Sequence, residues 1–433
     1  MRAGVSEIEF KPELGLMMGD GAPSARGYLT PLYVKAVVLA DDKTEVAIVA
    51  LDLIGMDLAD TAQAARLASE RCGVPADHIL MTCSHTHVAP SSMPSGSAYQ
   101  EAFNPHYNAE TKRREREFVD MIVLMIADAV CQARGDLREA SIGVATAELP
   151  WLVFNRRRHT RDYGVWTHWM KIPPNQAYRP EGPIDPELGL FVVRDAAHRP
   201  LCLLWNMTGH NSFNFGDLYS ADLTYTVQAA LDERMGQHVP CLYLPGCSGN
   251  TNYFDYGQPG GLEKATEGIA SAIMAIYRQA ATLPQVTLGC RKAELLFTRR
   301  DHTQYWWKHD IEMKLPSWVA YGAKDLDYFR AHGSPCRSSE IMALRIGQTA
   351  LVGLPGEIFV EFGMMIKERS PFRHTYVASY TNDYVGYVAT RRAFVGGSYE
   401  AWHVSSDVSR EGGYLMVDKA VELLEELYFC QGE

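Results

Sequence analysis

The chain has 433 residues, of which 47% are hydrophobic and 21% are charged, and its formal net charge is −11. The composition is that of an ordinary globular protein, and the length suits one large α/β domain or two medium ones. The acidic balance excludes the basic surface that nucleic-acid binding requires, so no nucleic-acid partner is expected.

The N-terminal residues lack a basic segment followed by an apolar run, and no stretch reaches the roughly 18 apolar residues of a membrane span. We therefore expect neither a secretory signal nor a transmembrane helix. The nine cysteines are scattered along the chain without a CxxC pair. This pattern favours reduced thiols and a cytoplasmic location.

Hydrophobic periodicity predicts hairpins and helices along the whole chain. The first half should contain a hairpin over residues 34–40 and 45–53, helices over 58–71 and 113–134, a strand over 79–83 and a hairpin over 190–194 and 201–207. The second half should contain helices over 225–235, 262–280 and 413–428, a strand over 240–244, a hairpin over 340–346 and 350–354, and a helix beginning near 357.

Strands and helices do not alternate strictly in this order. This favours an α/β fold of layered mixed β-sheets with flanking helices over a Rossmann or TIM arrangement. We expect residues 1–433 to form a single domain. Residues 301–335 stand apart, because they are dense in tryptophan and tyrosine and have no strand period. They could form a lid or pocket wall, or a peripheral insert with an aromatic core of its own.

Potential metal ligands follow three separate apolar strands. His85 and His87 come after the strand of residues 79–83, whereas His210 and Glu357 each follow a later strand. Alternate residues of a strand point to the same side, so the two histidines near residue 85 could face one cavity. A catalytic zinc ion takes about three imidazole or carboxylate ligands. The sequence therefore predicts a composite metal site; the alternative is a set of hydrogen-bonded polar residues at strand ends.

Ser248 lies in the loop PGCSGN, directly after the strand of residues 240–244. Small residues at such a position let backbone amides approach a ligand. Ser248 could be a nucleophile or a donor to a developing oxyanion. The alternative is a glycine-rich turn with a serine cap. The runs YVGYVAT and GGSYEAW add several tyrosines, which are by default core residues with satisfied hydroxyl groups.

The order of these motifs resembles the neutral/alkaline ceramidases. The resemblance extends over about residues 3–402 and rests on the motifs HTH, SAD, the Ser-Gly-Asn loop, PGE and a tyrosine-rich segment that ends in a Tyr-Glu pair. The family's HTHSGPGG reads HTHVAPSS in this chain, and its GDVSPN reads PGCSGN. The resemblance implies the fold of a ceramidase catalytic domain, and we expect no C-terminal immunoglobulin-like domain.

The resemblance also implies a zinc ion and a set of residues around it. The zinc ligands would be His85, His210, Glu357 and Tyr387. The groups that act on the substrate would be His87, Arg156, Ser248 and Tyr399. From its sequence context alone, Arg156 could instead belong to a solvated basic run, since it lies in NRRRHTR.

A water activated by Zn²⁺ that attacks an amide carbonyl is the chemistry this site would perform. We expect a zinc-dependent amidohydrolase that cleaves an N-acyl amide smaller than ceramide, with His87 and Arg156 moving a proton or holding the oxyanion. One alternative is an esterase or lactonase acting on a small cyclic substrate at the same site. A second is a non-catalytic binding protein of the same fold. The expected partner is a small-molecule substrate, and a homo-oligomer is compatible with the sequence.

Overall fold

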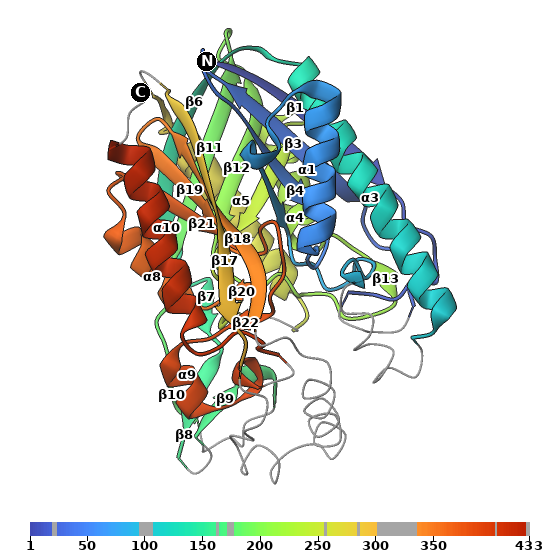
Figure 1. The fold of residues 1–433 in the computed structure, drawn as a ribbon, viewed down its shortest axis with the longest axis vertical. Helices are drawn as coiled ribbons and strands as arrows, with labels where there is room; N and C mark the ends of the chain where they lie inside the picture. The colour runs from blue at the N-terminus through green and yellow to red at the C-terminus, as the bar shows by residue number, and fades with distance from the viewer. Residues whose placement is uncertain are drawn as a thin grey trace.

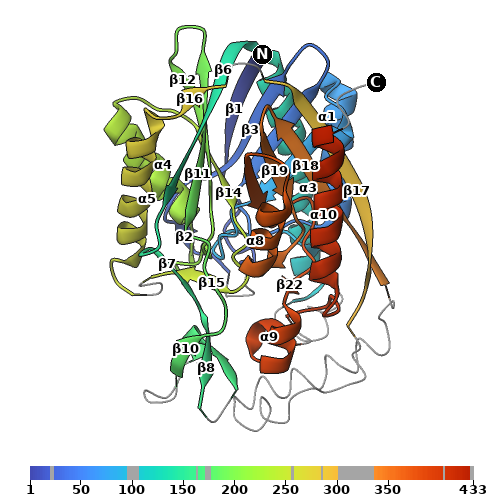
Figure 2. The same cartoon turned by 90° about the vertical axis from the view of Figure 1, so that its left-hand side faces the viewer.

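Two β-sheets pack face to face, and helices cover the outer face of each (Figures 1 and 2). The computed structural model describes residues 1–19, 24–94, 107–161, 164–170, 177–254, 258–283, 286–300, 336–402 and 405–429. The four-layer arrangement confirms the predicted α/β fold of layered mixed sheets with flanking helices. Residues 301–335, the expected lid or insert, lie outside the described residues.

The larger sheet has nine strands among the described residues. Its strand order is β14 (Cys241–Pro245), β12 (Pro200–Met207), β11 (Glu187–Asp195), β6 (Arg138–Glu148), β1 (Arg2–Phe10), β3 (Leu32–Ala40), β4 (Glu45–Leu51) and β5 (Ile79–Cys83), with β16 (Ala281–Thr282) paired to β6. The outermost pairs, β12–β14 and β4–β5, are parallel, whereas the pairs between them are antiparallel. A mixed sheet of this kind can place two ligand-bearing strand ends on the same edge.

The smaller sheet contains β17 (Leu288–Thr298), β18 (Cys336–Ile346), β19 (Thr349–Gly353) and β21 (His374–Ala378), in that order. Short strand groups lie near the ends of both sheets. They are β20 (Glu357–Ile358) with β22 (Tyr387–Val388), β7 (Val153–Asn155) with β15 (Thr251–Tyr253), β2 (Gly27–Tyr28) with β13 (Leu218–Tyr219), and the group of β8 (Arg157–Thr160), β9 (Val165–Thr167) and β10 (Ala177–Pro180).

Helices bury the outer faces of the two sheets. The larger sheet is covered by α1 (Leu58–Cys72), α3 (Ala109–Gly135), α4 (Leu223–Met235) and α5 (Gly261–Tyr277), and the smaller one by α8 (Val360–Arg369) and α10 (Gly412–Phe429). Alternation along β3 serves two cores, because Val34, Ala36 and Val38 pack toward helices while Val37 and Leu39 pack between the sheets. Among the described helices, none has the length and apolarity needed to cross a bilayer.

The helices and hairpins predicted from periodicity are present, with bounds that differ by a few residues. The helix expected to begin near Glu357 begins at Val360. Glu357 instead lies in β20, which pairs in parallel with β22. The extended backbone of Phe359, at the N-cap position of α8, separates this strand from the helix. Strands β1, β6, β16, β17 and β21 of the two sheets have no predicted counterpart. In β1, β6 and β17, exposed and part-buried residues interrupt the apolar pattern.

Close packing between the two sheets should make Gly189 in β11 intolerant of a side chain. A Cβ at this position would lie 2.1 Å from the ring of Tyr376, a fully buried residue of β21. We expect Gly189→Ala to lower the free energy of unfolding by about 1–3 kcal/mol, the usual cost of overpacking, measured by urea denaturation. The control is Gly135→Ala at the end of α3, where a Cβ would meet no atom within 4 Å. Equal stabilities of the two variants would contradict this account of the sheet contact.

Candidate metal centre

The predicted site residues lie just beyond the carboxyl ends of strands from both sheets. His85 follows β5, His210 follows β12, Ser248 follows β14, and Glu357 follows β19 after a Pro-Gly turn. In α/β folds, ligands commonly bind outside the carboxyl ends of strands, because the loops there can converge on one point. The sequence therefore places its polar groups at the end of the fold where a site can form.

The segment after β21 joins the two ends of the larger sheet. The amide of Ser379 donates to the carbonyl of Pro245 in β14 at 2.8 Å, and the amide of Cys83 in β5 donates to the carbonyl of Tyr380 at 3.3 Å. Strands β5 and β14, which stand at opposite ends of the strand order, are thereby held on either side of this segment. The histidines that follow β5 and β12 come together as a result.

The orientation of the His85 ring is set by its backbone conformation, by a hydrogen bond and by stacking on a tyrosine. Its φ of 61° lies in the left-handed region, and the residue is 1% exposed. Its Nδ1 lies 2.8 Å from the carbonyl oxygen of Ile54 and donates to it, so Nε2 is the ring atom directed toward Glu357. The ring stacks on Tyr380 with centroids 4.0 Å apart. Since His85 lies beyond β5, this turn rather than strand alternation brings its ring within 5.0 Å of that of His87.

Three potential ligand atoms converge on one point. They are His85 Nε2, His210 Nδ1 and Glu357 Oε2, each of which is buried and has no hydrogen-bond partner. Glu357 Oε2 lies 3.5 Å from His85 Nε2 and 3.9 Å from His210 Nδ1. Zinc bonds of roughly 2.0–2.2 Å in a tetrahedral site place neighbouring ligand atoms about 3.3 Å apart. The donor set and its separations thus fit a zinc-type cation, which would satisfy three buried atoms that each otherwise cost about 1–3 kcal/mol.

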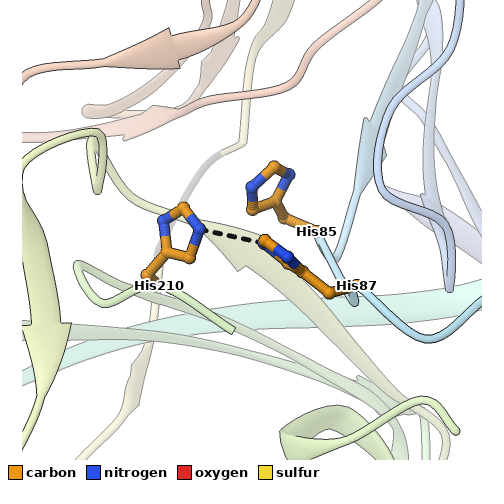
Figure 3. A group of neighbouring side chains, drawn as sticks. All are labelled: His85, His87 and His210. Atoms are coloured by element: carbon orange, nitrogen blue, oxygen red, sulfur yellow. Dashed lines mark hydrogen bonds between the residues drawn. The ribbon is translucent and has the colours of Figure 1, made fainter. Parts of the chain in front are cut away.

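His87 lies beside this group and faces His210 (Figure 3). The Nε2 atoms of the two rings are 3.0 Å apart. Ring nitrogens of His85, His87 and His210 all lie within 4.8 Å of one another, so the three histidines form a second donor set that could hold a metal ion. We favour the set with Glu357, because Glu357 Oε2 has no other partner whereas His87 Nε2 already has one.

Burial and neighbouring charge lower the pKa values of His87 and His210. Burial, reinforced by His85, lowers the pKa of His87 to about 3, so its ring is neutral at neutral pH. Burial also holds the pKa of His210 well below its usual value, with Arg156 and His85 adding to the effect. Neutral imidazole is the form that binds a metal or accepts a proton.

Glu357 is held as a carboxylate with one oxygen occupied and one free. The hydroxyl of Tyr384 donates to Oε1, and Oε2 points to the histidines. Burial by itself would raise the pKa of this carboxyl, but His85, Tyr384 and Tyr387 stabilise the charged form and the net shift is downward. Tyr387 lies beside Glu357, since the two are register partners in the parallel pair of β20 and β22.

Arg156 is a buried residue of the site. Its side chain donates to Glu400 Oε1 at 2.8 Å, to Asn252 Oδ1 at 3.1 Å, to the carbonyl of Gly249 at 2.9 Å and to the hydroxyl of Tyr387 at 3.0 Å. Arg156 is 2% exposed and the next residue, Arg157, is 0% exposed. The alternative that Arg156 belongs to a solvated basic run is therefore wrong, because Glu400, a buried carboxylate far along the chain, pairs with both arginines.

The remaining predicted residues, Ser248 and Tyr399, border the same site. Ser248 Oγ lies 3.0 Å from the hydroxyl of Tyr380, the residue that stacks on His85. The ring of Tyr399 lies 5.4 Å from that of Tyr387, measured between centroids. All eight residues that the resemblance names are therefore gathered in one region of the fold.

Two site tyrosines were not predicted from the sequence. Tyr384 opens the run YVGYVAT, in which only Tyr387 was expected at the site, yet the hydroxyl of Tyr384 donates to the carboxylate of Glu357. The position of this tyrosine run shortly after a strand could have indicated that Tyr384 belongs to the site. Tyr380 has no such signal, because its contacts with Ser248 and His85 arise only when distant strand ends meet.

No family model matches the chain. The neutral ceramidase of Pseudomonas aeruginosa is 34% identical over 96 residues, which are 20% of this chain and 14% of that relative. A crystal structure of neutral ceramidase from Pseudomonas aeruginosa superposes with a TM-score of 0.73 at 17% identity, over 98% of this chain and 74% of the other. A structure of ceramidase complexed with C2 gives a TM-score of 0.74 at 17% identity, over 98% and 75% of the two chains.

These similarities extend over nearly the whole chain in structure and over a short segment in sequence. The fold agrees with the resemblance predicted from the sequence. The chain therefore has the fold of the neutral ceramidases, and its resemblance to that family is confirmed at the level of the fold.

Proposed function

We propose that the protein is a metal-dependent hydrolase, with zinc as the expected metal, that cleaves the amide bond of an N-acyl substrate. One observation carries this proposal: unpartnered buried atoms of His85, His210 and Glu357 converge on a single point. The ceramidase fold supports it, since the named relatives are ceramidases. Tyr387 is the proposed fourth ligand, because it lies beside Glu357 in the paired strands β20 and β22.

Amide hydrolysis forms a bond from water oxygen to the carbonyl carbon, breaks the C–N bond and moves a proton to the leaving amine. A bound divalent cation would polarise the carbonyl and lower the pKa of water toward about 7. His87 is proposed to carry the proton, because its ring is part-exposed and lies beside the ligand group. A positioned base of this kind contributes about 10²–10⁴-fold to a rate.

Arg156, Ser248 and Tyr399 are proposed to act on the substrate around this centre. Four of the five N–H groups of a guanidinium are used by Arg156 for protein acceptors, which leaves one on Nη1 for a developing oxyanion. The hydroxyls of Ser248 and Tyr380 form a pair that could orient water or the substrate carbonyl. Tyr399, whose ring is part-buried beside Tyr387, would form one wall of the site.

The ligand set is tested by metal content. We expect about one metal ion per purified chain, lost in His210→Ala, in Glu357→Gln and in His85→Asn. Asparagine is the better replacement at position 85, because it tolerates the left-handed φ of 61° found there. Inductively coupled plasma mass spectrometry after gel filtration measures the metal and identifies it.

His87→Ala distinguishes the two donor sets. If Glu357 completes the site, this variant keeps its metal and loses turnover by about 10²–10⁴-fold. Metal lost from His87→Ala but kept in Glu357→Gln would instead establish the three-histidine set. A wild-type chain that neither carries nor gains a metal ion would contradict the proposed function altogether.

Tyr384 should tune metal binding through the carboxylate it holds. Because its hydroxyl occupies Oε1 of Glu357, Oε2 is directed to the histidines. We expect Tyr384→Phe to weaken metal affinity about 10–100-fold, the usual effect of losing an outer hydrogen bond to a ligand. Competition with a chromophoric chelator measures the affinity. Tyr376→Phe is the matched control, because its buried hydroxyl has no hydrogen-bond partner, and an equal loss in both variants would contradict this role.

The bond cleaved is tested with matched substrates. N-acyl amides of increasing chain length, up to ceramide, should be compared with the corresponding esters and with small lactones. We expect release of amine and fatty acid from amides, fastest for chains shorter than those of ceramide, and abolished by a chelator and in Glu357→Gln. Faster cleavage of esters or lactones would favour the esterase alternative, and binding without cleavage of any substrate would favour a binding protein.

A further inference from the structure

A buried chain of charges runs from β8 and β9 to the candidate metal centre. Its central member is Glu400, which is 0% exposed. Oε1 of Glu400 accepts from Arg156 Nε at 2.8 Å. Oε2 accepts from Arg157 Nη1 at 2.8 Å and from the hydroxyl of Thr167 at 2.7 Å. The carboxylate is thus clamped between two guanidinium groups, and Arg157 is paired on its other side with Glu181.

The two arginines differ in what else they reach. Besides its two carboxylate partners, Arg157 donates to the carbonyl of Gly397, so its contacts stay within the protein framework. Arg156 extends from Glu400 to the hydroxyl of Tyr387, 3.0 Å from Nη2. Its guanidinium is planar, so the bond from Nε to Glu400 also sets the direction of Nη2. Moving Glu400 would therefore move the donor that holds the oxygen of Tyr387.

A buried ion network is not explained by stability alone. Removing two charges from water costs more than their attraction often returns, and apolar replacements of such pairs are frequently neutral or stabilising. Oriented hydrogen bonds to a ligand, in contrast, routinely control metal affinity and geometry. A guanidinium beside the oxygen of a ligating tyrosine also favours the charge that such a ligand carries.

We propose that Glu400 is a positioning residue, which acts through Arg156 to aim the Tyr387 oxygen at the metal centre. This inference rests on the proposed function, in which Tyr387 is a metal ligand. It assigns to Glu400 a role distinct from that of Glu181, although both are buried carboxylates paired with Arg157. Glu181 has no contact with Arg156 among the interactions described, so it provides a matched control.

The test compares Glu400→Gln with Glu181→Gln in the full-length protein. Zinc has a filled d shell and gives no signal, so metal-free protein is loaded with copper(II) and the tyrosinate-to-copper charge-transfer band is recorded. Tyr387→Phe identifies the band by removing it. We expect Glu400→Gln to shift or weaken the band and to lower metal affinity about 10–100-fold. We expect Glu181→Gln to change thermal stability while leaving both band and affinity within about twofold of wild type, since its effect does not reach the ligands.

Several other outcomes would overturn the assignment. A wild-type band in Glu400→Gln, or equal changes in the two glutamine variants, would make Glu400 a merely structural residue. If Glu400→Gln does not fold, Thr167→Val, which removes one hydrogen bond to Oε2, should still shift the band. A wild-type protein that binds copper without the band would remove Tyr387 from the ligand set and overturn this inference, while the proposed function would stand on the other three ligands. A wild-type protein that binds no metal would end both.

Discussion

Two backbone hydrogen bonds, from Ser379 to the end of β14 and from Cys83 at the end of β5 to Tyr380, are the constraint on which the candidate site depends. They reinforce a direct contact, because Leu242 and Leu244 of β14 share one apolar core with Ile48 of β4 and Leu80 of β5. The hydroxyl of Thr82 adds a bond to the carbonyl of Ser379 at 2.9 Å. The same segment places the ring of Tyr380 against the ring of His85. The contact between the ends of the larger sheet and the packing of this candidate metal ligand therefore form together.

The electrostatics of the site follow from its burial. In a low-dielectric interior, a charge persists only where a partner or a set of donors holds it. Arg156 and Arg157 meet this condition through Glu400 and Glu181. Glu357 Oε2, His85 Nε2 and His210 Nδ1 have no hydrogen-bond partner, so each carries a desolvation cost that cation binding would remove. Binding should therefore be coupled to stability, as it is in other metal sites.

Much of the fold could be predicted from the sequence, because strand β5, the hairpins and the long helices have clear apolar periods. The potential ligands could also be located, since polar residues directly after buried strands are visible in sequence. The start of α8 could not, because a two-residue strand pairing with β22 decides whether Glu357 is helical. The burial of Arg156 could not be predicted either. Its sequence neighbours are basic, and the carboxylate that pairs with it, Glu400, lies 244 residues further along the chain. Tyr380 and Tyr384 acquire their roles from the same long-range closure.

The position of the closing segment in the chain has a consequence for biosynthesis. Strands β5 and β14 are synthesised well before residues 379–380. Both strands therefore leave the ribosome before the segment that hydrogen-bonds to them has been made. All five residues of each strand are buried in the finished protein, and until closure their backbone groups can pair with another chain. The nascent protein should therefore be prone to aggregation during this interval, and chaperones that bind exposed strands would reduce that aggregation.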